Sequence, residues 1–278
     1  PRPVSIALIE TGVHPHDAYD GLSESASEQR YAELVEARLL APTRALLADP
    51  DPPDLILWPE SSLPYTDVPV DDVAAGRVRL LARQFGAART RLVIGANVER
   101  SANRTPAALL LQLPDGAVLG HHEKQRLVPG GEFLPFVHWL PAAVAEVVHE
   151  AFRAALGSPP DCLPGVAQPP LLTADGTKFG ALLCYDNAFP EPAARLVAEG
   201  ATFLCVLSNE AWYRGGAELQ QLAAMTVCRA IELQTPIVRC TTDGWSLCVD
   251  ASGCVVADLP VEPSPHDGPR ILRCEVQP

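Results

Sequence analysis

Short apolar segments with strand character alternate with helical segments along the whole chain. The first strand-like segment is "VSIALIE" (4–10), and "DLILWPE" (54–60) follows a segment from about Ser23 to Ala48 that has helical periodicity. Apolar runs this short and continuous are typical of strands that are buried on both faces and connected by helices. The alternation therefore predicts an α/β fold with helices outside the strands, and few other folds accommodate it.

Hairpins interrupt this alternation. Their turns are expected at Pro114-Asp115-Gly116, at Asp175-Gly176 and at Ser252-Gly253. Further strands are predicted at 91–99, 201–209, 236–242 and 270–276, and further helices are predicted from Asp71 or Asp72 to about Phe85, at 142–156, after Phe189-Pro190 and at 219–234, with an irregular stretch at 157–170. The mixture favours an α/β sandwich in which the strands form two mixed sheets. We see no linker that would divide the chain, so one domain over residues 1–278 is expected.

Charge and hydropathy exclude several classes of protein. The formal net charge of −13 argues against general binding to nucleic-acid backbones or to anionic lipid headgroups. The chain has no window that approaches eighteen consecutive apolar residues, so no membrane span is predicted. It begins Pro-Arg-Pro and contains one methionine, Met225, which suggests a piece excised from a longer protein. The removed part could have been a signal peptide, a membrane region or another domain.

Cysteine is frequent, but its spacing does not indicate a metal site. None of the eight cysteines forms a C-x-x-C pair or a His/Cys cluster with zinc spacing, and most read as buried reduced thiols. Cys184 differs, because "ALLCYDNAFPE" (181–191) places it at the end of an apolar strand and close to the start of a helix. The partial positive charge of a helix N-terminus would lower the pKa of a thiol there, although a cysteine at a strand end is also a common core residue.

Three charged residues could complete a site around this thiol. Glu60 ends the strand in "LILWPESSLP", and Lys124 and Glu132 flank the turn in "HHEKQRLVPGGEFLPF". Taken singly, each of these three residues can equally well be interpreted as a solvated charged group on the surface. Together they could act as a base for the thiol, a cation for the developing negative charge and a carboxylate that holds the cation. Such a site needs no metal or organic cofactor.

The motifs that carry these residues resemble those of a known superfamily. "WPES", "EKQRLVPGGEFLP" and "CYDNAFPE" are similar in order and spacing to the Glu-Lys-Cys motifs of the nitrilase (carbon–nitrogen hydrolase) superfamily. "LSNEAWY" (207–213) and "RAIELQTPIVRCTTDGWSLCVDASG" (229–253) resemble the nitrilase-like domain of the apolipoprotein N-acyltransferases. Asp186, where those enzymes more often have Glu, and Arg126, where His is frequent, depart from the pattern. The resemblance implies a four-layer α-β-β-α sandwich.

The resemblance also implies a role for each site residue. Cys184 would be the nucleophile, Glu60 the general base and Lys124 the cation that stabilises an oxyanion, with Glu132 beside it. The implied substrate-binding residues are Tyr185, through its backbone N–H, and the aromatic residues Trp212 and Tyr213 near the entrance of the site.

Three functions remain open at this point. The resemblance implies transfer of a fatty acyl group from a phospholipid, through a thioester on Cys184, to the N-terminal amine of a lipoprotein, at the periplasmic face of the inner membrane. The same residues would serve a cytoplasmic amidase or nitrilase that hydrolyses a small amide, and a catalytically silent binding domain is a third possibility. A mobile apolar flap within 133–170 would suit lipid chains, whereas a closed polar pocket there would suit a small amide. Apolar residues of this segment fit such a flap and a helix packed on the core equally well: Phe133, Phe136, Val137, Trp139 and Leu140.

Overall fold

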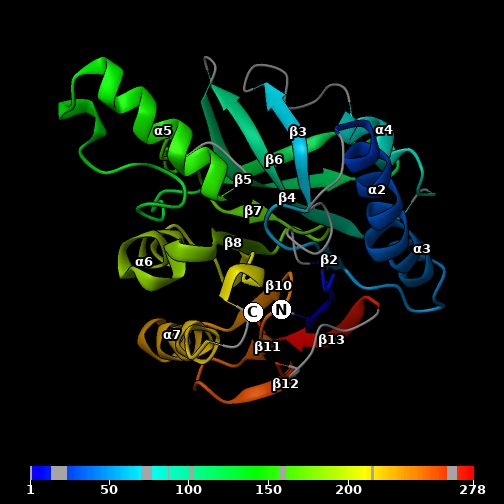
Figure 1. Ribbon diagram of the computed structural model, residues 1–278. Coiled ribbons are helices and arrows are strands. Elements are labelled where there is room, and N and C mark those ends of the chain that lie inside the picture. Colours follow the sequence, from blue (N-terminus) through cyan, green and yellow to red (C-terminus); the bar gives the residue numbers. More distant parts are fainter. Residues whose placement is uncertain are drawn as a thin grey trace.

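Two mixed β-sheets lie face to face, and helices cover the outer face of each (Figure 1). This computed structural model describes residues 2–13, 24–69, 77–86, 88–100, 103–156, 161–213, 216–261 and 268–278. The four-layer α-β-β-α sandwich implied by the resemblance is confirmed.

The first sheet has seven strands. Its order is β13-β1-β2-β4-β5-β6, and β3 pairs with β4 beside this path. The neighbours β1–β2, β2–β4 and β3–β4 are parallel, whereas β1–β13, β4–β5 and β5–β6 are antiparallel. The strands are β1 (Val4–Glu10), β2 (Leu55–Leu57), β3 (Leu63–Pro69), β4 (Arg91–Arg100), β5 (Asn103–Gln112), β6 (Val118–Glu123) and β13 (Arg270–Val276).

The second sheet has six strands in the order β12-β11-β10-β9-β8-β7. Its central strands β8, β9 and β10 are parallel, and the remaining neighbours are antiparallel. The strands are β7 (Leu171–Leu172), β8 (Lys178–Leu183), β9 (Phe203–Ser208), β10 (Ile237–Thr241), β11 (Ser246–Val249) and β12 (Val255–Leu259).

The helices divide between the two outer faces. In Figure 1, α2, α3 and α4 lie on the side of the first sheet, and α6 and α7 lie on the side of the second. The helices are α2 (Glu24–Val35), a π-helical turn η1 (Glu36–Leu40), α3 (Ala41–Leu47), α4 (Arg77–Ala82), α5 (Ala142–Leu156), α6 (Pro190–Ala198) and α7 (Glu218–Leu233), with short 3-10 helices η3 (Val137–Trp139), η4 (Cys184–Ala188) and η5 (Ala211–Tyr213). None of the helices in the described ranges is long and apolar enough to cross a bilayer.

Three apolar layers hold the sandwich together. Between the sheets, the rings of Phe179 and Phe203 stack with centroids 5.3 Å apart. Between the first sheet and its helices, Trp58 is fully buried and donates its indole N–H to Thr43 Oγ1 at 3.0 Å. A third layer, which includes Leu196, joins the second sheet to α6 and α7. The near-continuous apolar strands thus have a covered layer on both faces.

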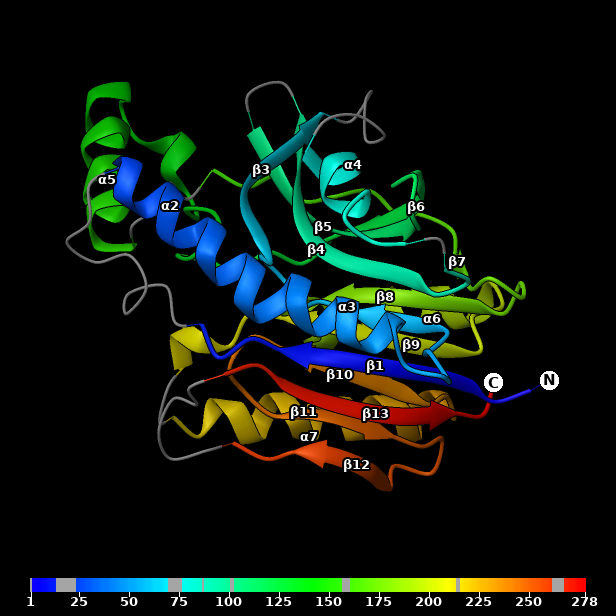
Figure 2. The same ribbon diagram turned by 90° about the vertical axis from the view of Figure 1, so that its right-hand side faces the viewer.

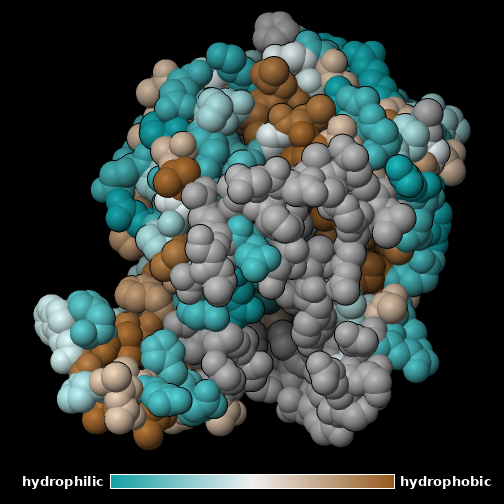
Figure 3. Space-filling view, turned by 90° about the horizontal axis from the view of Figure 1, so that it is seen from above, coloured by the Kyte–Doolittle hydropathy of each residue, from teal (hydrophilic) through white to brown (hydrophobic). Residues whose placement is uncertain are grey.

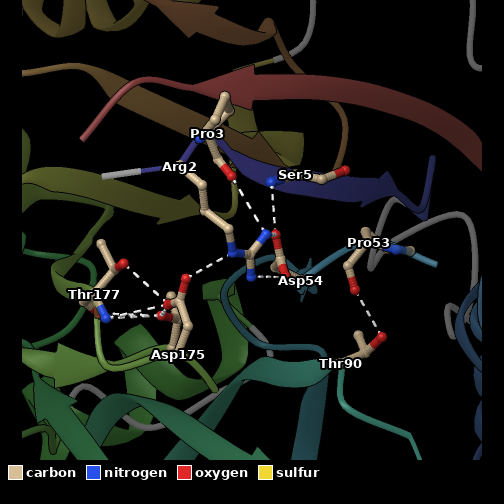
Figure 4. Close-up of polar contacts among 9 residues, drawn as sticks. Arg2, Pro3, Ser5, Pro53, Asp54, Thr90, Asp175 and Thr177 are labelled. Atoms are coloured by element: carbon tan, nitrogen blue, oxygen red, sulfur yellow. Dashed lines mark hydrogen bonds and ion pairs between the residues drawn. The ribbon is translucent and has the colours of Figure 1, made fainter. Parts of the chain in front are cut away.

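A polar cluster ties the two sheets together where their strands begin (Figure 4). Arg2 Nη2 lies 2.7 Å from Asp54 Oδ1, just before β2, and Arg2 Nε lies 2.9 Å from Asp175 Oδ2, in the turn before β8. Asp54 Oδ2 also accepts a hydrogen bond from the backbone N–H of Ser5 at 3.0 Å. The opposite end of these strands, where β2 and β8 finish, is the end that carries the candidate catalytic residues.

The predicted elements are largely confirmed, with three differences. The strand predicted at 54–60 ends at Leu57, so Glu60 lies in a turn. The helix predicted to end near Phe85 is seen as 77–82, and its expected caps Asp71 and Asp72 lie outside the described residues. Strand β3 was not predicted, because Pro64 and Pro69 weaken the strand signal of its sequence.

Candidate active site

Glu60 is placed by the end of β2. The backbone N–H of Trp58 still donates to Val93 O of β4 at 2.9 Å, and the chain then turns away at Pro59. Gly95 of β4 lies directly beneath this turn, since a Cβ built there would be 2.3 Å from Pro59 O and 2.6 Å from Glu60 Cα. A glycine at position 95 therefore lets the two backbones approach and fixes the height of the Glu60 side chain above the sheet.

Lys124 bridges two carboxylates in the interior. Its side chain is 1% exposed, and its Nζ lies 2.8 Å from Glu60 Oε1 and 2.6 Å from Glu132 Oε1. The second oxygen of each carboxylate accepts a backbone hydrogen bond, from Asn209 at 3.0 Å to Glu60 and from Val128 at 2.8 Å to Glu132. Three charged side chains predicted from two separate motifs thus form one hydrogen-bonded group.

Cys184 follows β8 and is the first residue of η4. Its φ angle is +42°, a left-handed value that is unusual for a residue with a side chain and costs about 1–3 kcal/mol. The prediction that a helix lies close by holds for α6, but a 3-10 turn comes first, and Cys184 itself makes the turn out of the strand.

Asp186 joins this turn to the segment that follows Lys124. Its Oδ1 accepts the backbone N–H groups of Gln125 at 3.0 Å and Arg126 at 2.7 Å, and its Oδ2 accepts that of Leu183 at 3.2 Å. Burial raises the pKa of Asp186 to about 6. One buried carboxylate therefore sets the position of the thiol relative to the ammonium.

The electrostatic environment keeps the thiol neutral at rest. Burial and the negative charge of Glu60 raise the pKa of Cys184 to about 11, although Lys124 and a hydrogen bond from Ser208 act in the opposite direction. The expectation that a helix N-terminus would lower this pKa is wrong, because desolvation outweighs it. A neutral thiol needs a base before it can attack, and Glu60 is the carboxylate whose charge acts most strongly on it.

Lys124 remains positively charged although its side chain is buried. Desolvation alone would lower the pKa of Lys124, but Glu60, the thiolate form of Cys184 and Glu132 together raise it well above its ordinary value. Burial and repulsion from Glu60 raise the pKa of Glu132, and the positive charge of Lys124 acts in the opposite direction. The site therefore holds a permanent cation between two carboxyl groups that compete for it.

Comparison with known proteins assigns this arrangement to a family. The family model for carbon-nitrogen hydrolases matches residues 24–264. The chain belongs to the carbon-nitrogen hydrolase family.

Relatives within this family include acyltransferases. The chain is 31% identical over 257 residues to the apolipoprotein N-acyltransferase of Geobacter metallireducens, covering 90% of this chain and 44% of that protein. It is 29% identical over 259 residues to the apolipoprotein N-acyltransferase of Azotobacter vinelandii, covering 93% of this chain and 46% of that protein. The chain thus spans less than half the length of these relatives.

Solved carbon-nitrogen hydrolases share the fold. An amidase from Nesterenkonia sp. superposes with a TM-score of 0.61 and 22% identity, over 98% of this chain and 89% of that chain. Nit3 of Saccharomyces cerevisiae, a member of the nitrilase superfamily, gives a TM-score of 0.62 and 19% identity, over 99% and 91% of the two chains. At these identities the likeness shows the architecture and leaves the reaction open.

The environments of two of the three predicted aromatic residues, Tyr213 and Tyr185, are described by the structure. Tyr213 is half-buried, and burial together with the negative charge of the ionised Cys184 raises its pKa, while its substrate-binding role stays a prediction. The ring of Tyr185 packs edge-on against Phe189 with centroids 5.1 Å apart. The oxyanion role of the Tyr185 N–H stays a prediction, and the side chain of Trp212 lies outside the described part of the structure.

The buried ring of His122, close to Lys124 in the sequence, contacts backbone groups of other segments. The ring nitrogens of His122 lie 2.8 Å from Ala181 O of β8 and 2.8 Å from Pro169 O, and burial lowers its pKa. Within the described ranges, no group of three or more His, Cys, Asp or Glu side chains that could hold a metal ion lies together.

One part of the site escaped the sequence analysis. Ser208 ends β9, and Asn209 and Glu210 follow it. Ser208 lowers the pKa of Cys184, the backbone N–H of Asn209 donates to Glu60, and Glu210 pairs with the buried Arg239. In the sequence they served only as a marker of family resemblance. The signal that identified Glu60, polar residues at the end of an apolar strand, was equally present in "FLCVLSNE" (203–210).

Proposed function

We propose that this chain is the catalytic domain of a cysteine-dependent N-acyltransferase. It moves a fatty acyl group from a phospholipid to Cys184 as a thioester, and then to the N-terminal amine of a lipoprotein. The observation that carries the acyl-transfer chemistry is the buried Lys124, held between Glu60 and Glu132 and acting on the charge of Cys184. The names of the relatives, apolipoprotein N-acyltransferases, support a lipoprotein as the acyl acceptor, and the phospholipid donor is what the resemblance of the motifs implies.

The first half of the reaction forms the thioester. Glu60 accepts the thiol proton as the sulfur of Cys184 attacks the acyl carbonyl of the phospholipid, and Lys124 stabilises the oxyanion that results. When the oxyanion collapses, the ester C–O bond breaks, and Glu60 returns the proton to the departing lysophospholipid oxygen. The neutral resting thiol makes this base essential, because a pKa of about 11 leaves little thiolate at neutral pH.

The second half releases the acyl group. The α-amine of the acceptor attacks the thioester carbonyl, Glu60 takes a proton from the attacking nitrogen, and a C–N bond replaces the C–S bond. The proton then returns to the sulfur, which restores the neutral thiol. Lys124 serves the second oxyanion as it served the first, and its raised pKa keeps it charged throughout the cycle.

The surface beside η3 and α5 supports a lipid donor. Phe136 is 63% exposed, Trp139 is 73% exposed and Val147 on α5 is 68% exposed. In Figure 2, α5 stands clear of the sheets on the side toward which β1 runs, the side where β2 and β8 also end. Figure 3, seen from above, shows hydrophobic (brown) surface on the projection at its lower left, the side on which α5 stands at the top of Figure 1. These exposed apolar side chains would suit an enzyme that meets acyl chains, and contact of this surface with the periplasmic face of the inner membrane is part of the proposal.

An amidase that hydrolyses a small amide is the second candidate. The amidase from Nesterenkonia sp. has the same fold, and a mutant of it carries the acetamide moiety of fluoroacetamide covalently added at its active-site cysteine. In this alternative Glu60, Lys124 and Cys184 keep their roles, and water replaces the amine as the second nucleophile.

Mass spectrometry after incubation with phospholipid vesicles tests the proposal. A fatty-acyl mass on the intact protein, mapped to Cys184 and lost when a lipidated N-terminal peptide is added, is the expected result. The variant Cys184→Ala serves as the control for acylation of the exposed Cys228 and Cys254. Ammonia release from acetamide, with no acyl adduct on Cys184, would support the amidase. The absence of both activities would leave the binding-domain interpretation.

A further inference from the structure

The end of β9 lies beside the candidate nucleophile because of strand register. In the parallel pair β8–β9, Leu183 lies opposite Leu207, so the next residues, Cys184 just after β8 and Ser208 at the end of β9, lie side by side. Ser208 is fully buried, and its hydroxyl lowers the pKa of Cys184, as a hydrogen-bond donor to the ionised sulfur does. The pairing of Ser208 with Thr241 of β10 holds its backbone from the other side.

Three consecutive residues at the end of β9 and in the turn after it act on three different groups. Ser208 lies beside Cys184 and lowers its pKa, the backbone N–H of Asn209 donates to Glu60 Oε2 at 3.0 Å, and the Glu210 carboxylate forms an ion pair with Arg239. One short segment therefore reaches the nucleophile, the base and a buried cation.

The ion pair beneath the turn is itself unusual in its burial. Neither Glu210 nor Arg239 has an exposed side-chain surface, and Arg239 Nη1 donates to Thr226 Oγ1 at 3.3 Å. Burial lowers the pKa of Arg239 to about 10, so it remains charged at neutral pH. Gly244 makes room for the carboxylate, because a Cβ built there would lie 2.3 Å from Glu210 Oε2. Buried ion pairs contribute little net stability, so stability alone does not explain the presence of the Glu210–Arg239 pair at this position.

The single proton of the Ser208 hydroxyl links these contacts. In the structure Ser208 Oγ lies 3.1 Å from Glu210 Oε1 and donates to it, so the carboxylate holds the single hydroxyl proton while the thiol is neutral. Once the sulfur is a thiolate it can only accept, and the hydroxyl must turn to donate to it. Glu210 tolerates the loss of this donor because Arg239 still neutralises it.

We propose that Ser208 is a positioning residue that donates its hydroxyl proton to the Cys184 sulfur whenever the thiolate forms, and that the Glu210–Arg239 pair releases the hydroxyl for this purpose. The inference rests on the proposed role of Cys184 as nucleophile. The loss of Ser208 would leave the thiolate with weaker stabilisation and make the thiol harder to ionise. The charged and titratable groups that act on Cys184 from the surrounding elements are Glu60 after β2, Lys124 after β6, Glu132 in the following loop, Tyr213 in η5 and Arg239 in β10.

Alkylation of Cys184 by iodoacetamide at a series of pH values tests this inference without any substrate. The exposed Cys228 and Cys254 are first replaced by serine, and the modified Cys184 peptide is quantified by mass spectrometry. Below the thiol pKa the rate follows the fraction of thiolate. Ser208→Ala is expected to react about tenfold more slowly than the parent, which is the effect of about one pH unit. The rate of Ser208→Ala at any pH should therefore equal the rate that the parent shows at a pH about one unit lower. The thermal midpoint should change little.

Two comparisons separate this role from a packing effect. Ser208→Thr and Ser208→Val have nearly the same volume and differ in the hydroxyl, so the Thr variant should react about tenfold faster than the Val variant even if Ser208→Ala does not fold. Thr242→Val removes a buried hydroxyl that contacts the Ser208 carbonyl at 3.4 Å, and the rate at Cys184 should stay unchanged.

Equal rates for Ser208→Ala and its parent across the pH series would overturn the inference, as would equal rates for the Thr and Val variants. Because alkylation needs neither phospholipid nor acceptor, these results are independent of whether acyl transfer itself is observed.

Discussion

Replacement of Lys124 by methionine should destabilise the fold through charge and leave packing nearly intact. The side chain is 1% exposed and its Nζ lies 2.8 Å from Glu60 and 2.6 Å from Glu132. At such distances each contact has a Coulomb energy of about 6 kcal/mol if the effective dielectric constant is about 20, and desolvation of the ammonium offsets much of it. Removal of one partner from a buried ion group costs about 3–5 kcal/mol, because the remaining charges stay buried. We expect a loss of that size in the free energy of unfolding at about pH 8.

The loss should depend on pH in a defined direction. Burial and Glu60 already raise the pKa of Glu132 above its ordinary value, and removal of Lys124 takes away the cation that opposes them. A carboxyl group whose pKa is higher in the folded than in the unfolded protein stabilises the fold at low pH, and this contribution is lost as pH rises through the folded pKa. The destabilisation by Lys124→Met should therefore be greatest at about pH 8 and become smaller toward about pH 5.

Urea unfolding followed by tryptophan fluorescence at both pH values measures this effect. Lys178→Met removes an exposed lysine and should change the free energy of unfolding by less than about 0.5 kcal/mol. The double variant Lys124→Met with Glu132→Gln should recover about half of the loss or more, because one carboxylate no longer repels the other. A loss below about 1 kcal/mol at pH 8, or a loss that is the same at both pH values, would refute the description of Lys124 as a buried cation that neutralises two carboxylates.

Three further substitutions test the geometry of the site. Cys184→Ala should abolish acyl-enzyme formation in intact-mass spectra and preserve the circular dichroism spectrum, whereas an acyl adduct that persists would remove Cys184 from the mechanism. Gly95→Ala should cost about 1–3 kcal/mol in urea unfolding and slow acylation, because the new methyl group must displace Pro59 and Glu60; wild-type values for both would show that the turn moves freely. Asp186→Asn should cost about 1–3 kcal/mol, since its amide group would face the Leu183 N–H, and an unchanged thermal midpoint would argue against that contact.

The local sequence was sufficient for most of the elements. Continuous apolar runs such as 4–10 and 203–208, separated by amphipathic segments, are buried as strands, and the turns at Asp175-Gly176 and Ser252-Gly253 close hairpins as expected. These features depend on residues that are neighbours in the chain, through side-chain periodicity and backbone preference. The positions of Glu60 and Cys184 at strand ends follow from the same signals, and the resemblance of their motifs supplied the superfamily.

Tertiary structure alone decided how these parts act on one another. The register that sets Cys184 beside Ser208, and the contact of the Asn209 N–H with Glu60, join residues 24 and 149 positions apart. The pKa of Cys184 is the clearest case. A strand end near a helix suggested a lowered value, and the structure raises it to about 11, because burial and the charge of Glu60 come from segments that sequence proximity does not reveal. Desolvation and Coulomb interactions depend on distances through space, so they exist only once the sheets have paired.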